Sequence, residues 1–177
     1  GDKYSLEYVQ KLYNMVQRHS TILHNFYVFT DKPEVAKEKL TGHINVRQFP
    51  MVNLQGWWNK MQLFHPGMLE GTTLYMDLDV VITGNIDCFF EHEPEADFVG
   101  MNDFNPSTKI FNSSVFRFQP EAMKDKLWQP FINDREKWLR YSGDQNVISE
   151  VIMKHPETKS FPDSWTQSYK WHDRLGR

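Results

Sequence analysis

Asp77 and Asp79 are the residues of this sequence with the clearest potential for chemistry. They lie in the segment LYMDLDVVITGNID, residues 74–87, where the apolar residues around them indicate a buried strand over 73–82. Aspartate is a poor strand former, and burial of a carboxylate without a partner is costly. A metal ion, a phosphoryl group or a set of backbone donors would each offset that cost. Because residues i and i+2 of a strand point to the same face, we expect the two carboxylates to converge.

Two hard oxygen donors at this spacing suit Mg²⁺ or Mn²⁺ that enters with a diphosphate. The chain has a formal net charge of -3 and no cluster of lysine and arginine, so an anionic ligand would need a cation. The same charge balance argues against a nucleic-acid protein that works by neutralising phosphates. An alternative interpretation is that both aspartates cap the end of the strand and the following turn.

The hydrophobic pattern predicts a single α/β domain over residues 1–177. Its sheet is expected to be largely parallel, with helices on its faces and ligands bound beyond the carboxyl ends of the strands. Asp77 and Asp79 belong near such an end. Strands are predicted at 26–30, 44–50, 73–82, 97–101 and 110–118, and helices at 5–19, 57–64, 121–138 and 145–154, before an irregular C-terminal segment.

The cysteine count and the lack of a targeting segment indicate the compartment of the protein. The single cysteine, Cys88, excludes an internal disulfide, and neither a membrane span nor a signal peptide is recognisable. We therefore expect a cytoplasmic protein; a longer parent protein attached peripherally to a membrane is an open alternative.

Trp57 and Trp58 are adjacent, so a helix buries only one of them fully on a single face. The other either stacks on a sugar or covers the sheet edge, and packing is favoured.

A phosphatase of the haloacid-dehalogenase type fits part of the same pattern. In that class, Asp77 would be the nucleophile and Asp79 the general acid and base, and residues 142–146, SGDQN, would supply the later acidic motif. More than seventy residues precede Asp77, however, whereas that motif usually lies near the start of its domain. The lysine and second acidic ligand that such a phosphatase needs are also not convincingly positioned.

Several segments taken together resemble family 8 type glycosyltransferases, the GT-A-fold group that includes glycogenin and bacterial lipopolysaccharide sugar transferases. The similarity is greatest to a branch of small bacterial and viral proteins and spans nearly the whole chain. Most specific are the Asp-x-Asp segment and the Trp-Trp-Asn-Lys helix. The segments are YSLEYVQKLYNMVQRH (4–19), FYVFTD (26–31), GWWNKMQLFHPGML (56–69), LYMDLDVVITGNID (74–87), FNSSVFRF (111–118), GDQNVIS (143–149) and SYKWH (168–172).

The resemblance implies a metal-dependent hexosyltransferase that takes a nucleotide-diphosphate sugar, a UDP-sugar by analogy, and transfers the sugar to a glycan hydroxyl with retention. Mn²⁺ or Mg²⁺ would bridge the diphosphate and stabilise the leaving group. In this comparison, Asp77 contacts the ribose and the metal, and Asp79 is the main metal ligand. Thr30 and Asp31 line the base and ribose, and Lys60 contacts the donor. The alternative for Lys60 is a solvated helix charge.

The remaining implied site residues lie in the second half of the chain. Asn112 and Ser113 would meet the donor sugar, although a plain strand with the serine facing the core is an alternative. Asp144 would bind sugar hydroxyls, and Gln145 would lie on the reacting face of the anomeric carbon. No nucleophile is evident, which favours stabilisation of an oxocarbenium-like species and attack on the face that the diphosphate leaves. A capping role for Asp144 at the start of a helix is compatible with this.

Two departures from the family indicate a fragment of a longer chain. An apolar first strand is expected before GDKYS, and a His-x-Gly-x-x-Lys-Pro segment, with a third metal ligand, is expected after Arg177. The spacing of His172 does not support a substitute ligand, whereas Lys170 is a better candidate for contact with phosphate. Without these ends, a domain that binds nucleotide sugar or carbohydrate without turnover is a further alternative. The resemblance suggests an acceptor of the lipopolysaccharide or cell-surface glycan type and no particular oligomeric state.

Overall fold

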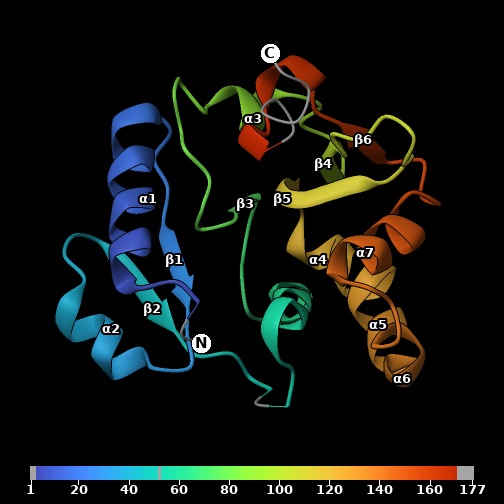
Figure 1. Cartoon of the computed structure of the whole chain (residues 1–177), viewed down its shortest axis with the longest axis horizontal. Coiled ribbons are helices and arrows are strands. Elements are labelled where there is room, and N and C mark those ends of the chain that lie inside the picture. Colours follow the sequence, from blue (N-terminus) through green and yellow to red (C-terminus); the bar gives the residue numbers. More distant parts are fainter. Residues whose placement is uncertain (1–2, 52, 171–177) are drawn as a thin grey trace.

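The computed structural model describes residues 3–51 and 53–170. In this part of the chain, two sheets lie side by side with helices around them (Figure 1). The smaller sheet and its two helices are formed by residues up to 47, and the larger sheet follows from residue 73 onward. This mixture of helices and strands confirms the predicted α/β class.

The first half of the chain forms helix α1, Leu6–His19, and a two-stranded parallel sheet. Every third or fourth residue of α1 is apolar, and its buried side chains Val9, Leu12, Tyr13 and Val16 follow that spacing. Strand β1, Phe26–Phe29, pairs with β2, Ile44–Arg47, and the short helix α2, Pro33–Lys39, connects them. The crossover between the two parallel strands is thereby made by a helix of only two turns.

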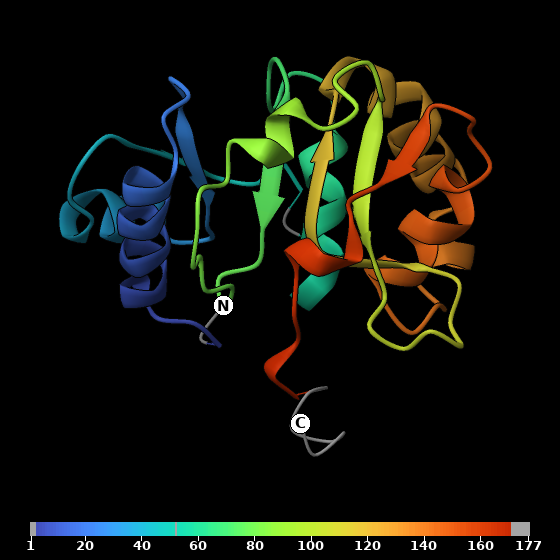
Figure 2. The same ribbon diagram turned by 90° about the horizontal axis from the view of Figure 1, so that it is seen from above.

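The larger sheet has four strands in the order β3-β5-β4-β6 (Figure 2). They are β3, Thr73–Met76, β4, Phe98–Asn102, β5, Phe111–Phe118, and β6, Thr158–Ser160. Strands β3, β4 and β6 run in one direction, and β5 runs against them between β3 and β4. This sheet is therefore mixed, and the prediction of a largely parallel sheet is wrong for it, because β5 lies antiparallel between β3 and β4. The carboxyl end of β3 lies next to the amino-terminal half of β5.

Helical segments cover one face of this sheet. They comprise the 3-10 helix η1, Gly56–Phe64, then α4, Pro120–Met123, the π-helical turn η2, Lys124–Trp128, α5, Gln129–Asn133, α6, Arg135–Trp138, and α7, Asp144–Ile152. The main core lies between these segments and the sheet. Phe64, Phe116 and Phe118 are almost fully buried there; Phe64 stacks on Phe116 and meets Phe118 edge to face. Aromatic rings at this density supply much of the apolar area that the domain buries.

A second core lies on the α1 side of the sheet, and its buried cluster includes Leu12 and Val16 of α1 and Val99 and Val115 of the sheet. Helix α3, Cys88–Glu91, and the 3-10 turn η3, Asp163–Trp165, close this side. Arg117 on β5 is fully buried here, and its guanidinium donates to the backbone carbonyls of Phe89, Phe90, His92 and Glu93. These carbonyls belong to the last turn of α3 and to the two residues after it, and they have no helical partner, so the arginine takes the place of a C-terminal cap.

Several sequence-based boundaries are wrong. The strand predicted at 73–82 ends at Met76, because Asp77 begins a turn in which the Val80 amide donates to the Asp77 carbonyl. The helix predicted at 121–138 is four short segments, α4, η2, α5 and α6, interrupted at Asp134. Helix α2 and strand β6 were not predicted, since α2 buries only Ala36 and β6 is three residues long.

Candidate active site

Asp77 and Asp79 lie in the turn directly after the carboxyl end of β3. The Asp77 amide donates to the Ser114 carbonyl on β5 at 2.8 Å, which anchors the start of the turn to the neighbouring strand. The Asp77 side chain is 29% exposed, and Asp79 is exposed. The two residues are therefore in a turn and not in a buried strand, so strand alternation does not set their directions. Their predicted location at a strand end is correct.

Lys60 joins the predicted site residues into one cluster. Its ammonium nitrogen lies 3.2 Å from Asp77 Oδ1 and 3.1 Å from Asp144 Oδ2. It also donates to the carbonyl oxygen of Ser113 at 2.9 Å and to Ser113 Oγ at 3.1 Å. The Lys60 side chain is only 10% exposed, which excludes the alternative of a solvated helix charge. A lysine in this position bridges η1, the turn after β3, strand β5 and helix α7.

An irregularity in β5 turns Ser113 toward this cluster. Gly100 of β4 pairs with Phe116, and the next residue, Met101, pairs with Asn112, so residues 113–115 have no partner on β4. Such bulges re-aim side chains and are frequent beside active sites. Here the Ser113 hydroxyl donates to Asp144 Oδ2 at 2.8 Å, while Asn112 Oδ1 accepts from the Ser114 amide at 3.0 Å. Ser113 thus belongs to the cluster, and Asn112 has a local contact within β5.

Helix α7 begins at Asp144 and carries two of the predicted residues. Gly143 is the N-cap, so a capping role for the Asp144 side chain is wrong; Asp144 is the first helical residue, where a carboxylate is favoured by the helix dipole. Its side chain is 7% exposed. Gln145 accepts from the Ser113 amide at 3.3 Å and donates to Asp103 Oδ2 at 2.9 Å. Both residues are therefore tied to β5, and Gln145 is also tied to the loop after β4.

Tyr75 holds the Asp77 carboxylate in a fixed orientation. Its hydroxyl donates to Asp77 Oδ1, and its ring stacks on Phe116 at 4.8 Å between centroids. The Lys60 ammonium lies 5.0 Å from the centre of the same ring. Burial, followed by the negative charge of Asp77, raises the pKa of Tyr75 well above its usual range. The phenol therefore keeps its proton and remains a donor at physiological pH.

Asp79 has a partner from the start of the chain. The Tyr4 hydroxyl donates to Asp79 Oδ2 at 2.7 Å, and burial together with this hydrogen bond raises the pKa of Tyr4. In the part of the chain that the structure describes, Asp77 and Asp79 make no side-chain hydrogen bond to the backbone of the turn. The interpretation of both residues as caps of the strand and turn therefore lacks the contacts it requires.

Thr30 and Asp31 follow the carboxyl end of β1 and line a separate cavity of about 380 Å³. Among the described residues, no hydrogen bond or ion pair joins Thr30 or Asp31 to the Lys60 cluster directly. Helix η1 links the two regions, because Asn59 lines the cavity and the next residue is Lys60. The cavity is also lined by Gln48, Phe49, Met51, Leu54, Gln55 and Gly56.

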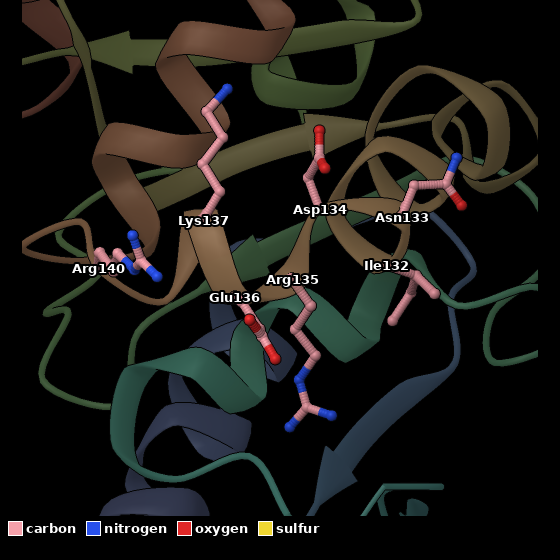
Figure 3. Close-up of a pocket in the computed structure, with 7 residues that line it drawn as sticks. All are labelled: Ile132, Asn133, Asp134, Arg135, Glu136, Lys137 and Arg140. Atoms are coloured by element: carbon pink, nitrogen blue, oxygen red, sulfur yellow. The ribbon is translucent and has the colours of Figure 1, made fainter.

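A second hollow of about 460 Å³ lies over α5 and α6 and contains none of the predicted site residues (Figure 3). Arg135 and Glu136 point to one side of the ribbon, and Lys137 and Asp134 point to the other (Figure 3). Arg135 also donates to the Asn53 carbonyl at 3.1 Å. Charges of both signs that diverge in this way do not form a convergent binding site.

The carboxylates fit a divalent cation that arrives with a ligand. Both contacts to the Asp77 side chain go to Oδ1, and the hydrogen bond to Asp79 goes to Oδ2, which leaves one oxygen of each carboxylate for a metal. Hydrogen bonds to ligating carboxylates are typical of metal sites. Within residues 3–51 and 53–170, no group of three or more histidine, cysteine or acidic side chains is arranged to hold a metal. The remaining coordination would have to come from ligand oxygens and water, as is usual for Mg²⁺ with phosphates.

Sequence reasoning missed three residues of this region: Tyr75, Tyr4 and Asp103. Tyr75 lies two residues before Asp77, and a phenol near a buried carboxylate is a usable signal for an orienting hydrogen bond. Tyr4 and Asp103 are remote from their partners in sequence, and no local pattern points to them. His172 lies outside the described residues, and Lys170 is exposed.

No family profile and no curated protein matches the sequence. Among solved structures, the chain is similar to the glycosyltransferase GlyE of Streptococcus pneumoniae TIGR4, with a TM-score of 0.70 and 16% sequence identity over 99% of this chain and 47% of that one. The apo form of GlyE gives a TM-score of 0.65 and 16% identity over 90% of this chain and 43% of GlyE. The chain thus has a glycosyltransferase fold, consistent with the GT-A type, and spans less than half the length of GlyE.

Of the helices that the structure describes, none combines the length and the apolar character needed to cross a lipid bilayer.

Proposed function

We propose that this domain is part of a glycosyltransferase that binds a nucleoside diphosphate sugar, a UDP-sugar by analogy, through Mn²⁺ or Mg²⁺. The observation that carries the proposal is the cluster of Lys60, Asp77, Ser113 and Asp144 at the carboxyl end of β3, in a fold shared with a glycosyltransferase. Three separated segments of the chain converge there on one buried ammonium group. A structural ion pair alone would not need the additional exposed carboxylate of Asp79.

The charge of the cluster explains why a cation is part of the proposal. Asp77, Asp79 and Asp144 carry three negative charges, and Lys60 supplies one positive charge. A diphosphate would therefore be repelled, whereas a divalent cation would be attracted to the free oxygens of Asp77 and Asp79. Bound there, the cation would act as a Lewis acid on the departing diphosphate. The cavity lined by Thr30 and Asp31 would then receive the nucleoside.

The side chains of the cluster have distinct roles in the proposed reaction. Asp144, held by Lys60 and Ser113, accepts hydrogen bonds from the hydroxyls of the donor sugar. Gln145 lies beside it and faces the anomeric carbon. The bond between that carbon and the diphosphate oxygen breaks, the acceptor hydroxyl forms the new bond on the same face, and its proton passes to the departing phosphate. Retention of configuration follows from this sequence of events.

Calorimetric titration with UDP tests the proposal. In the presence of Mn²⁺ we expect binding that disappears when the ion is chelated and that falls at least tenfold in Asp79→Asn. Asp125→Asn, which removes an exposed carboxylate from η2, is the matched control and should bind as the unaltered domain does. A UDP affinity that changes neither on chelation of the ion nor in Asp79→Asn would contradict the proposed site, and so would a complete lack of binding.

Two simple assays distinguish the proposed transferase from the alternatives, a phosphatase and a domain that binds its ligand without turnover. A phosphatase would release phosphate from p-nitrophenyl phosphate, and we expect no such activity, because the fold is shared with glycosyltransferases. A domain that only binds its ligand would retain UDP and Mn²⁺ but would never release UDP from UDP-glucose or UDP-galactose, with or without an acceptor. We expect slow UDP release from one such donor.

A further inference from the structure

Trp57 is an aromatic residue on η1 that the core does not use. The residue is 59% exposed, whereas the adjacent Trp58 packs inward and stacks on Phe131 at 6.4 Å between ring centroids. The sequence predicts one core tryptophan, which is Trp58, and favours packing for the other, but Trp57 keeps more than half of its surface exposed. A tryptophan exposed to this extent gains little from folding and leaves its flat ring open to a ligand.

The position of Trp57 relates it directly to the candidate active site. Helix η1 is a 3-10 helix with three residues per turn, so Trp57 and Lys60 lie on the same face, one turn apart. A Cβ atom at Gly143 would lie 3.8 Å from the indole Nε1 and 4.0 Å from Cδ1. The indole edge therefore lies against the residue that precedes Asp144. Trp57 thus stands at the rim of the cluster formed by Lys60, Asp77, Ser113 and Asp144.

The chemistry of the indole suits a sugar. One face of a pyranose ring carries mainly C–H groups, which pack on a flat aromatic surface, while its hydroxyls remain available for hydrogen bonds. Within the described residues, the indole Nε1–H of Trp57 has no hydrogen-bond acceptor, so it is free to donate to a sugar hydroxyl. The nucleoside cavity is lined by other residues and does not include Trp57.

We propose that Trp57 is a platform for a pyranose ring of the glycan acceptor, which it holds at the rim of the cluster with a hydroxyl directed toward the donor sugar. This inference rests on the proposed function and adds to it the class of acceptor and one residue that binds it. Trp57 does not take part in bond breaking.

NMR of the tryptophan indole N–H groups tests the binding step without turnover. The Trp57 signal is assigned as the one that disappears in Trp57→Phe. The probes are the methyl glycosides of glucose, galactose, mannose and N-acetylglucosamine, added in the presence of UDP and Mg²⁺. We expect at least one of them to shift the Trp57 signal and to bind about tenfold more weakly to Trp57→Ala. Trp57→Phe should retain most of the affinity, because it keeps an aromatic face.

Tyr169→Ala removes another highly exposed aromatic side chain and is the matched control, which should bind the sugar normally. Because Trp57 is exposed, Trp57→Ala should leave the melting temperature almost unchanged, so a loss of binding does not reflect unfolding. The inference is overturned if no methyl glycoside shifts the Trp57 signal, or if the sugar that binds keeps its affinity in Trp57→Ala.

Titration of the variants with UDP and Mn²⁺ separates this inference from the proposed function. Trp57→Ala should bind UDP within twofold of the unaltered domain. A marked loss of UDP affinity would assign Trp57 to the donor and overturn the acceptor platform. If the unaltered domain itself fails to bind UDP, the proposed function fails, and the acceptor platform fails with it.

Discussion

Replacement of Lys60 by methionine removes the positive charge that connects four parts of the domain. The change leaves the Asp144 carboxylate, 7% exposed, with only the Ser113 hydroxyl as a close partner, and it leaves Asp77 with Tyr75. Loss of one partner of a buried ion pair typically costs 3–5 kcal/mol. Because Asp77 is 29% exposed and partly screened by solvent, we expect the lower end of that range, about 3 kcal/mol. In a domain of this size, that corresponds to a fall of about 9 °C in melting temperature.

Urea unfolding followed by circular dichroism measures this loss. The double variant Lys60→Met with Asp144→Asn should recover about 2 kcal/mol, because the unpaired buried charge is then gone. Lys37→Met is a control: Lys37 pairs with Glu34 on the exposed surface of α2, where such pairs contribute little. A loss below about 1 kcal/mol in Lys60→Met, or no recovery in the double variant, would refute the idea that Lys60 neutralises a buried carboxylate.

Three further changes test other parts of the structure. Arg117→Met should lower the free energy of unfolding by roughly 3 kcal/mol in urea melts, since four backbone carbonyls lose their donor; a neutral change would refute its capping role. The Thr21 hydroxyl, with further hydrogen bonds, holds the pKa of Asp87 far below its ordinary value, so its stabilisation is complete at neutral pH and is lost as pH falls below about 4. The difference in melting temperature between the unaltered domain and Asp87→Asn should therefore be large at pH 7 and shrink toward pH 2, and an equal difference at both would contradict this. Gly100→Ala should lower the free energy of unfolding in urea by about 2 kcal/mol, because the added Cβ would lie 2.8 Å from the ring of Phe111. Unchanged stability would show that the neighbouring side chains shift to make room for it.

Long segments with a clear apolar period were predictable from the sequence. Helix α1 and strand β5 were found where their apolar residues repeat. The strand predicted at 73–82 was too long at its carboxyl end, because apolar residues continue past the two aspartates into the turn. Short and polar elements were not predictable. Helix α2 buries one residue, and the π-helical turn η2 inside the C-terminal helical segment leaves no distinct trace in the spacing of apolar residues.

The candidate site likewise has features that the sequence indicated and features that depend on tertiary packing. A resemblance to a family indicated Lys60, Ser113 and Asp144, and the structure brings these three residues together with Asp77. Spacing alone did not reveal this convergence, because the residues come from η1, β5 and α7 and meet only through tertiary packing. The roles of Tyr4 and of the bulge in β5 depend on hydrogen bonds between remote residues, which no local pattern records.

The most direct test of the account is the position of a bound cation. Crystals of the domain grown with UDP and Mn²⁺ should show an anomalous scattering peak for manganese bonded to carboxylate oxygens of Asp77 and Asp79 and to the diphosphate. Lys60 should remain against Asp144 in that structure. A manganese peak at another position, or a bound UDP whose phosphates lie away from both aspartates, would contradict the proposed role of this turn.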